Sequence, residues 1–272
     1  MKVSCAQLDV VFGDTDANLS KLSSVLQGPA TQGNDLIVFP ECFLTGYCVN
    51  SLEAAQEISL TYDPRQGAFT DLANLAKSNS TNMVVGFSQR VQDQIFNSAV
   101  LVRRDGTQEL YQKTHLPFLG LDRFATPGPD INVFETDIGR IGVLICFDLR
   151  HSEPTRVLTL KGADIIVLPT NWPIGAEAGP KFMVSARAAE NRVFYAACNR
   201  VGTESDFRFI GQSLICDVYG NELARAGEDE CLISAQINVE EARSKRTIVQ
   251  SGCYELDLMG SRRPELYGAI VS

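Results

Sequence analysis

Histidines and closely spaced cysteine pairs are scarce in this sequence. Histidine occurs only as His115 and His151, and none of the eight cysteines belongs to a Cys-x-x-Cys pair. Because the common zinc sites use closely spaced cysteines and histidines, those sites are excluded. Nothing else in the sequence points to a metal.

Long apolar runs and an excess of basic residues are also missing. No stretch approaches the ~20 apolar residues that a membrane helix needs. The N-terminal segment MKVSCAQLDVVFGD lacks the apolar core of a signal peptide and reaches an acidic residue at Asp9. The 24 lysines and arginines are outnumbered by 33 aspartates and glutamates, and the net charge is −9. This balance disfavours binding to nucleic acid or to an anionic membrane surface.

The eight cysteines are interpreted as free thiols. Cys146, Cys198 and Cys216 lie inside apolar, strand-like runs, where a free cysteine behaves as a small hydrophobic residue. The chain length and the lack of a signal peptide favour a reducing compartment. We therefore expect a cytoplasmic protein.

Strand-like and helix-like patterns alternate along the chain, which predicts an α/β fold. Apolar residues at helical spacing follow Asn18, and DLIVFP and ADIIVLP are typical of buried strands. The last helix is expected over residues 240–248. No low-complexity linker divides the chain, so we predict one domain over residues 1–272.

Two segments of the chain resemble each other. GNDLIVFPE (residues 33–41) and GADIIVLPT (residues 162–170) both combine a glycine, an acidic residue, an apolar run and a proline. The pattern indicates two similar βα units, although buried strands in general look alike. Ligands of open α/β sheets bind beyond the carboxyl ends of strands, so the residues just after each run are of interest.

Three residues near predicted strand ends carry reactive groups. Cys146 follows IGVLI, Glu41 follows LIVFP, and Lys113 lies in LYQKTHLPF. A thiol near free backbone N–H groups can act as a nucleophile, and a desolvated carboxylate has a pKa raised toward the range useful for proton transfer. Taken singly, each has an ordinary alternative: a core cysteine, a solvated loop glutamate and a surface lysine.

The sequence segments around these three residues together resemble a known family. FPECFLTGY, YQKTHLPF and GVLICFDLRHSEPTR, in this order, are similar to the nitrilase (carbon–nitrogen hydrolase) superfamily, and so are the later NWP, ARAAENRVFYAACNRVG and RRPELYG. The resemblance implies a four-layer αββα sandwich and a catalytic triad of Glu41, Lys113 and Cys146. It also implies a homodimer, as an eight-layer sandwich, or a higher homo-oligomer, with the C-terminal tail of about residues 250–272 packed in the dimer.

The resemblance further implies a mechanism without a metal or organic cofactor. Glu41 takes the proton from Cys146 as the sulfur attacks a carbonyl carbon. Lys113 and the backbone N–H of Phe147 then hold the developing oxyanion, where losing one donor typically costs about 10²–10³ in rate. Water activated by Glu41 hydrolyses the thioester.

One supporting residue departs from the family pattern. Many members carry a second glutamate after the lysine block, but HLPFLGLDRFATPG contains none. Asp122 is the nearest carboxylate, and it either replaces that glutamate or forms a salt bridge with Arg123.

Further residues are candidates for the pocket, each with an ordinary alternative. Arg150 contacts a substrate carboxylate or is solvated at a helix start. Asn171 and Trp172 line the pocket, or Trp172 lies in the core or a dimer contact. Tyr47 and Phe43 form an apolar wall or pack in the core. Arg187 and Glu190 are interpreted as a structural ion pair, and Asp148 as support for the turn.

The favoured function is hydrolysis of a small linear amide. Hydrolysis of an N-carbamoyl amine or amino acid is the alternative, and nitrile hydrolysis is a less favoured one. A non-catalytic binding or scaffold protein is the remaining class. The intact set of Glu41, Lys113 and Cys146 argues against it.

Overall fold

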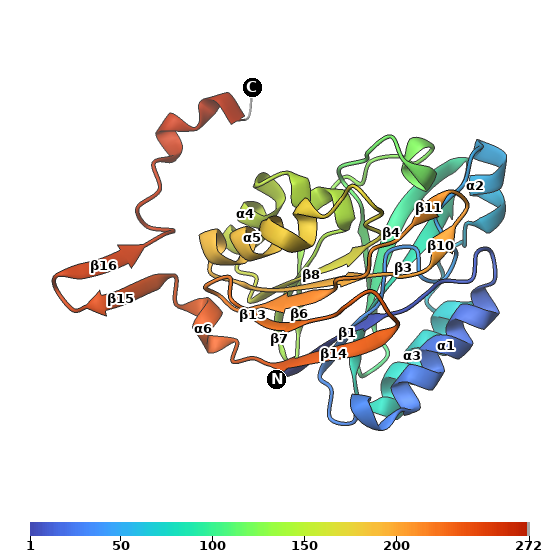
Figure 1. Ribbon diagram of the computed structural model, residues 1–272, viewed down its shortest axis with the longest axis horizontal. Coiled ribbons are helices and arrows are strands. Elements are labelled where there is room, and N and C mark those ends of the chain that lie inside the picture. Colours follow the sequence, from blue (N-terminus) through green and yellow to red (C-terminus); the bar gives the residue numbers. More distant parts are fainter. Residues whose placement is uncertain (271–272) are drawn as a thin grey trace.

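The computed structural model describes residues 1–270 and shows two six-stranded mixed sheets packed face to face (Figure 1). The first sheet has the order β14-β1-β2-β3-β4-β5, and the second has the order β13-β12-β9-β8-β7-β6. The strands of the first sheet are β1 (Lys2–Gln7), β2 (Leu36–Val38), β3 (Asn82–Val91), β4 (Gln94–Val102), β5 (Gln108–Gln112) and β14 (Cys231–Gln236). Those of the second are β6 (Val133–Thr136), β7 (Gly139–Val143), β8 (Ile165–Thr170), β9 (Phe194–Asn199), β12 (Leu214–Cys216) and β13 (Glu222–Arg225).

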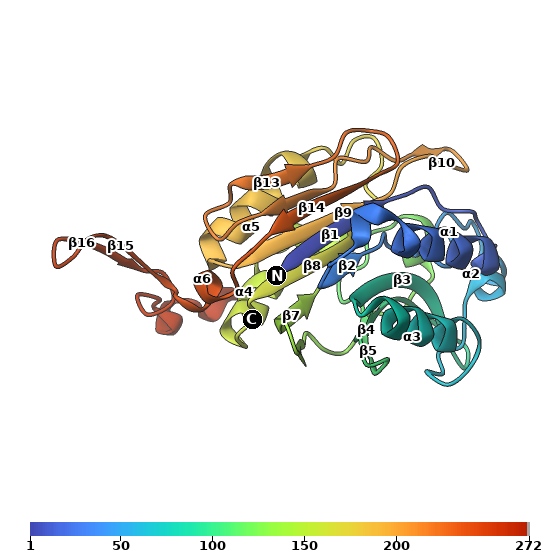
Figure 2. The same ribbon diagram turned by 90° about the horizontal axis from the view of Figure 1, so that it is seen from below.

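Helices cover the outer face of each sheet. The helices α1 (Thr15–Gln27) and α3 (Gly67–Asn79) lie on the first sheet, and α4 (Glu153–Leu160) and α5 (Val184–Asn191) lie on the second (Figures 1 and 2). Their apolar faces are buried: Leu22 and Leu72 join one core cluster, and Leu158 and Ala188 join the cluster that fills the space between the sheets. The expected four-layer αββα arrangement is confirmed.

Shorter elements connect these layers. The remaining helices and strands are α2 (Leu52–Ile58), α6 (Glu240–Arg243), β10 (Thr203–Glu204), β11 (Phe207–Arg208), β15 (Arg246–Gln250) and β16 (Tyr254–Asp257). Single helical turns are η1 (Pro29–Thr31), η2 (Gly120–Arg123), η3 (Cys146–Arg150), η4 (Gly179–Met183), η5 (Pro264–Leu266) and η6 (Gly268–Ile270).

The two sheets repeat one pairing pattern, as the similarity of residues 33–41 and 162–170 indicates. In the first sheet β2 has parallel neighbours, β1 and β3, and the pairings β3–β4, β4–β5 and β1–β14 are antiparallel. In the second sheet β8 has parallel neighbours, β7 and β9, and the pairings β9–β12, β12–β13 and β6–β7 are antiparallel. The matching segments therefore hold the same place in each half.

The prediction of a last helix over residues 240–248 is wrong in its second half. Helix α6 ends at Arg243, and residues 246–250 form β15, which pairs with β16. The β-branched run Thr247, Ile248 and Val249 favours an extended chain. The hairpin and the segment after it project from one end of the sandwich (Figures 1 and 2).

The cysteines are free, as predicted. All eight lie within residues 1–270 and none forms a disulfide, and Cys5, Cys198 and Cys216 are buried. Residues 1–270 also contain no helix long and apolar enough to cross a membrane. The reducing compartment stays a prediction.

Gly86 of β3 lies against the chain that carries Glu41. A Cβ at this position would lie 2.5 Å from both the Pro40 carbonyl oxygen and the Cys42 nitrogen. Gly86→Ala therefore forces this backbone apart, and we expect a loss of about 1–3 kcal/mol in unfolding free energy, measured by urea denaturation. Gly227→Ala is the matched control, since no atom lies within 4 Å of a Cβ there. Equal stability of the two variants would contradict this reading of the close approach.

Candidate active site

The ammonium of Lys113 lies between two carboxylates. Its Nζ donates to Glu41 Oε1 at 2.7 Å and to Asp122 Oδ2 at 2.6 Å, and all three side chains are buried. Glu41 comes shortly after β2, Lys113 directly follows β5, and Asp122 lies in η2. A lysine ammonium has three donors, so one N–H remains available beyond these two contacts.

Asn97 of β4 completes this network. Its Nδ2 donates to Glu41 Oε1 at 2.7 Å and to Asp122 Oδ1 at 2.8 Å. Lys113 pairs with this strand through its backbone N–H, which donates to the Asn97 carbonyl oxygen. Asn97 was not among the residues predicted from the sequence. The available signal was a single amide directly before the apolar run SAVLV.

One oxygen of Glu41 is left free. Both hydrogen bonds go to Oε1, whereas the buried Oε2 has no hydrogen-bond partner within residues 1–270. A buried carboxylate oxygen without a partner is costly and is typical of a functional group. Oε2 is therefore the atom that can receive a proton.

Burial and charge set the pKa of each reactive group. Desolvation raises the pKa of Glu41, Lys113 opposes this and Asp122 reinforces it. Desolvation would lower the pKa of Lys113, but the charges of Asp122 and Glu41 outweigh it and raise that pKa well above its usual range. Desolvation, reinforced by the charge of Glu41, raises the pKa of the Cys146 thiol to about 12. Cys146 is therefore a neutral thiol at rest and needs a base to react.

The turn that carries Cys146 is held in an unusual backbone conformation. Cys146 begins η3 beyond the end of β7 and has a φ of 41°, in the left-handed region. Non-glycine residues are held there only when the surroundings impose it.

The buried Asp148 holds the turn that carries Cys146 in this conformation. Its Oδ2 accepts from the Ile145 N–H at 2.9 Å and the Tyr111 hydroxyl at 2.7 Å, and its Oδ1 accepts from the His115 N–H at 3.0 Å. The interpretation of Asp148 as support for the turn is confirmed. His151 stacks on His115, with the ring centroids 4.4 Å apart.

Cys146 lines a cavity of about 520 Å³. Its lining contains five of the residues predicted for the pocket, Tyr47, Phe147, Arg150, Asn171 and Trp172, together with Cys146 itself. The side-chain amide of Asn171 is buried, and neither its oxygen nor its nitrogen has a hydrogen-bond partner within residues 1–270. This amide is therefore available to a ligand.

The structure decides several of the alternatives. Asp122 pairs with Lys113 and not with Arg123, whose guanidinium lies over the rings of Phe118 and Phe124. Phe43 packs in the core behind the first sheet. Arg187 and Glu190 form the expected ion pair, with 3.0 Å between Nη1 and Oε1.

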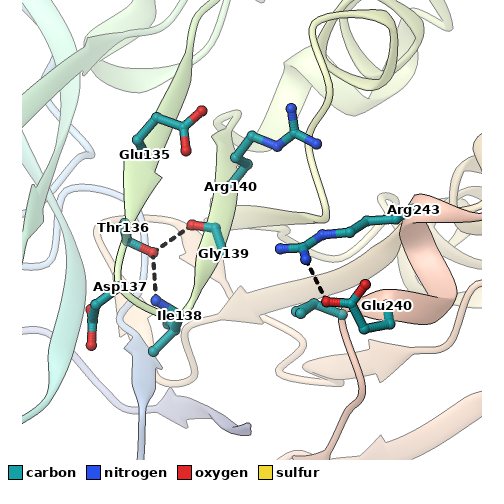
Figure 3. Close-up of a pocket in the computed structure, with 9 residues that line it drawn as sticks. Glu135, Thr136, Asp137, Ile138, Gly139, Arg140, Glu240 and Arg243 are labelled. Atoms are coloured by element: carbon teal, nitrogen blue, oxygen red, sulfur yellow. Dashed lines mark hydrogen bonds and ion pairs between the residues drawn. The ribbon is translucent and has the colours of Figure 1, made fainter.

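A second hollow lies away from this chemistry. It has a volume of about 590 Å³ between the β6–β7 turn and α6, and Figure 3 shows its polar lining. Thr136 bonds within its own turn, and Arg243 pairs with Glu240. Cys146 does not line this hollow but lines the smaller cavity, so we place the candidate site at the smaller cavity.

Known proteins resemble this chain over most of its length. The carbon-nitrogen hydrolase family matches residues 2–247. A protein named nitrilase from Pyrococcus abyssi is 34% identical, over 98% of this chain and 99% of its own length. A 2-oxoglutaramate amidase from Bacillus subtilis is 31% identical, over 90% of this chain and 93% of its own length.

A solved structure shares the fold. It is a variant of the amidase from Nesterenkonia sp. AN1 with covalent addition of the acetamide moiety of fluoroacetamide at the active-site cysteine. Its TM-score is 0.81 at 22% identity, over 99% of this chain and 96% of that chain. At this identity the likeness establishes the fold alone.

If Glu41 is the base for Cys146, alkylation of the thiol follows the ionisation of Glu41. We expect the rate of Cys146 alkylation by iodoacetamide to rise with pH through a midpoint above the usual pKa of a glutamate, and then to level off. Peptide mass spectrometry of quenched samples measures the rate at Cys146 separately from the other free cysteines, of which Cys253 is exposed. A thiol acting alone, with a pKa of about 12, would instead give about a tenfold rise per pH unit without a plateau.

Asp122→Asn tests the charge that acts on Glu41. Because the Asp122 carboxylate raises the pKa of Glu41, its removal lowers that pKa, and the midpoint of the profile moves to lower pH. Asp130→Asn, at an exposed position, is the matched control and leaves the midpoint in place. A midpoint that moves upward in Asp122→Asn would contradict the assignment.

Proposed function

Because the chain belongs to the carbon–nitrogen hydrolase family of the nitrilase superfamily, we propose that it hydrolyses a small linear amide through a thioester on Cys146. The observation that carries the proposal is the buried contact of Lys113 with Glu41 and Asp122, next to an open cavity lined by Cys146. The covalent adduct at the cysteine of the Nesterenkonia amidase supports the same chemistry.

The first half-reaction joins the substrate to sulfur. Glu41 Oε2 accepts the thiol proton while the Cys146 sulfur bonds to the carbonyl carbon, and the carbonyl electron pair moves to oxygen. The remaining N–H of Lys113 and the backbone N–H of Phe147 donate to this oxyanion. When the carbon–nitrogen bond breaks, Glu41 returns the proton to the leaving nitrogen, and ammonia departs.

The second half-reaction releases the acid. Glu41 takes a proton from water as the water oxygen attacks the thioester carbon. Collapse of this second intermediate breaks the carbon–sulfur bond, and the proton returns to Cys146. The product is a carboxylic acid, and neither half-reaction consumes a cofactor.

Arg150 favours an amide that carries a carboxylate at its other end. It lines the cavity and is exposed, and within residues 1–270 no carboxylate forms an ion pair with it. No residue of the described lining is acidic, and Arg150 is its one cation, available to an anionic group. The 2-oxoglutaramate amidase of Bacillus subtilis, named for such a substrate, supports this class.

Two other substrate classes fit the same machinery. N-carbamoyl amino acids also carry a carboxylate, and their hydrolysis releases carbon dioxide besides ammonia. The relative from Pyrococcus abyssi is named a nitrilase, so nitriles belong in the test.

The substrate panel compares ω-amides of dicarboxylic acids, neutral aliphatic amides, N-carbamoyl amino acids and nitriles, with ammonia and carbon dioxide measured in parallel. We expect turnover of the ω-amides and none by Cys146→Ala. Carbon dioxide release would move the assignment to the N-carbamoyl class. No turnover in any class, with a Cys146 that iodoacetamide does not alkylate selectively, would favour a non-catalytic family member.

Arg150→Gln tests the carboxylate contact within this panel. We expect KM for an ω-amide to rise about tenfold, because a charge-assisted hydrogen bond is lost, with KM for a neutral amide unchanged. Arg65→Gln, at an exposed arginine outside the cavity, is the control. An equal rise in KM for both substrates would remove Arg150 from carboxylate recognition.

We also propose that the C-terminal arm, residues 246–270, packs against a second copy of the chain. The β15–β16 hairpin is two-stranded, and such a hairpin is marginally stable alone in water. It nevertheless exposes apolar side chains, namely Ile248, Val249, Tyr254, Leu256, Leu266 and Ile270. Exposed apolar patches of this kind are typical of interfaces between subunits.

Charges on the arm test this assembly. The double variant Ile248→Lys/Val249→Lys changes two exposed residues and should fold normally. Light scattering should give at least twice the chain mass of 29.8 kDa for the wild type and a lower mass for this variant. Val91→Lys, at an exposed residue of β3, is the control. A wild type of 29.8 kDa would contradict the proposal.

A further inference from the structure

A fully buried arginine lies outside the reactive cluster. Arg200 follows β9, and its side chain has no exposed surface. Its Nη1 donates to Glu204 Oε2 at 2.6 Å, its Nη2 donates to Asp9 Oδ1 at 2.9 Å, and its guanidinium lies 4.4 Å from the centre of the Phe209 ring. Removing charges from water costs several kcal/mol per ion, so stability alone is a weak reason to keep a buried pair.

The second oxygen of Glu204 holds a segment of the site. Its Oε1 accepts from the backbone N–H of Tyr47 at 2.7 Å and from that of Cys48 at 2.5 Å. These residues lie 157 and 156 positions away along the chain. Glu204 therefore uses one oxygen for Arg200 and the other for the backbone of the segment that carries Tyr47.

Tyr47 in turn contacts the group that holds Lys113. Its hydroxyl donates to Asp122 Oδ2 at 2.9 Å, the oxygen that also accepts from Lys113 Nζ. The hydroxyl is also within 3.0 Å of the Leu119 carbonyl oxygen, and the Tyr47 carbonyl oxygen accepts from the Leu121 N–H at 2.8 Å. Gly120, with a φ of 46°, leaves room for the Tyr47 ring, because a Cβ there would lie 2.6 Å from Cε1.

We propose that the Arg200–Glu204 ion pair is a positioning element of the site: it fixes the Tyr47 backbone, and Tyr47 fixes Asp122 against Lys113. The inference rests on the proposed function, because the proposed function gives Lys113 its role at the oxyanion. Neither Arg200 nor Glu204 lines the cavity, so both act through Tyr47 and not on the substrate.

The contacts from Glu204 through Tyr47 to Asp122 predict that substitutions of Glu204 and Tyr47 have coupled effects on activity. Without the Glu204 carboxylate, a glutamine at this position has one oxygen, which can accept either from Arg200 or from the Tyr47 and Cys48 N–H groups. The Tyr47 segment then loses its anchor, and displacement of a catalytic group by about 1 Å can cost up to 10²-fold in rate. If the effect travels through the Tyr47 hydroxyl, it disappears once that hydroxyl is gone.

The test is a double-mutant cycle of Glu204→Gln and Tyr47→Phe. Activity is measured as kcat for an ω-amide per folded protein, with the folded fraction taken from the unfolding curve of each variant. We expect Glu204→Gln to lower kcat about tenfold in the wild-type background and less than about twofold in the Tyr47→Phe background. Thermal unfolding is recorded for all four proteins, and Arg200→Lys serves in the same cycle if Glu204→Gln does not fold.

Glu228→Gln is the matched control. Glu228 pairs with Arg208, which lies in the same β10–β11 hairpin as Glu204. Both partners of this ion pair are exposed, so loss of the ion pair should leave kcat unchanged. A merely structural role for Glu204 would lower the unfolding temperature and leave kcat per folded protein at the wild-type value. Either that result or an equal fall of kcat in both Tyr47 backgrounds would overturn the proposal.

Failure of the proposed function would be seen separately. If the wild type hydrolyses no amide, the double-mutant cycle uses the pH midpoint of Cys146 alkylation in place of kcat, because alkylation needs no substrate. Positioning through Tyr47 then predicts that Glu204→Gln moves the midpoint in the wild-type background and not in Tyr47→Phe. An unmoved midpoint in both backgrounds contradicts it.

Discussion

The contact of one buried ammonium with two buried carboxylates determines how the rest of the site works. With Lys113, Glu41 and Asp122 all ionised, the fully buried cluster carries a net charge of −1. Such a cluster is costly, and Asn97 reduces the cost by donating to both carboxylates, although Glu41 Oε2 keeps no partner within residues 1–270. In the proposed mechanism, the excess negative charge keeps Glu41 ready to accept a proton, while Lys113 stays charged for an oxyanion.

The sandwich is what brings these groups together. Lys113 and Asn97 face each other because Lys113 directly follows β5, which pairs with β4, and Glu41 comes shortly after a third strand, β2. Cys146 comes from the second sheet, at the equivalent end of its half. In the proposed reaction the two similar halves therefore contribute different partners: the first gives the base and the cation, and the second gives the nucleophile.

The sequence predicted the parts that local patterns carry. The strand-end positions of Glu41 and Cys146 follow from apolar runs, and the αββα order follows from the family resemblance that the motif blocks carry. Asn97, Arg200 and Glu204 were missed because their importance depends on contacts with residues far away along the chain, such as the Glu204 contact with Tyr47 across 157 positions. The choice between Lys113 and Arg123 as the partner of Asp122 likewise required the fold. The helical expectation for residues 240–248 failed because pairing of β15 with β16 outweighed a short amphipathic pattern.

The central claim is that Cys146 carries the acyl group during turnover. The most direct measurement is rapid acid quenching of the protein with an ω-amide, followed by peptide mass spectrometry. The account predicts an acyl mass increase on the peptide that contains Cys146, which appears before ammonia release reaches its steady rate and is absent in Cys146→Ala. Steady amide turnover by Cys146→Ala, or a transient acyl group found on any other residue, would contradict it.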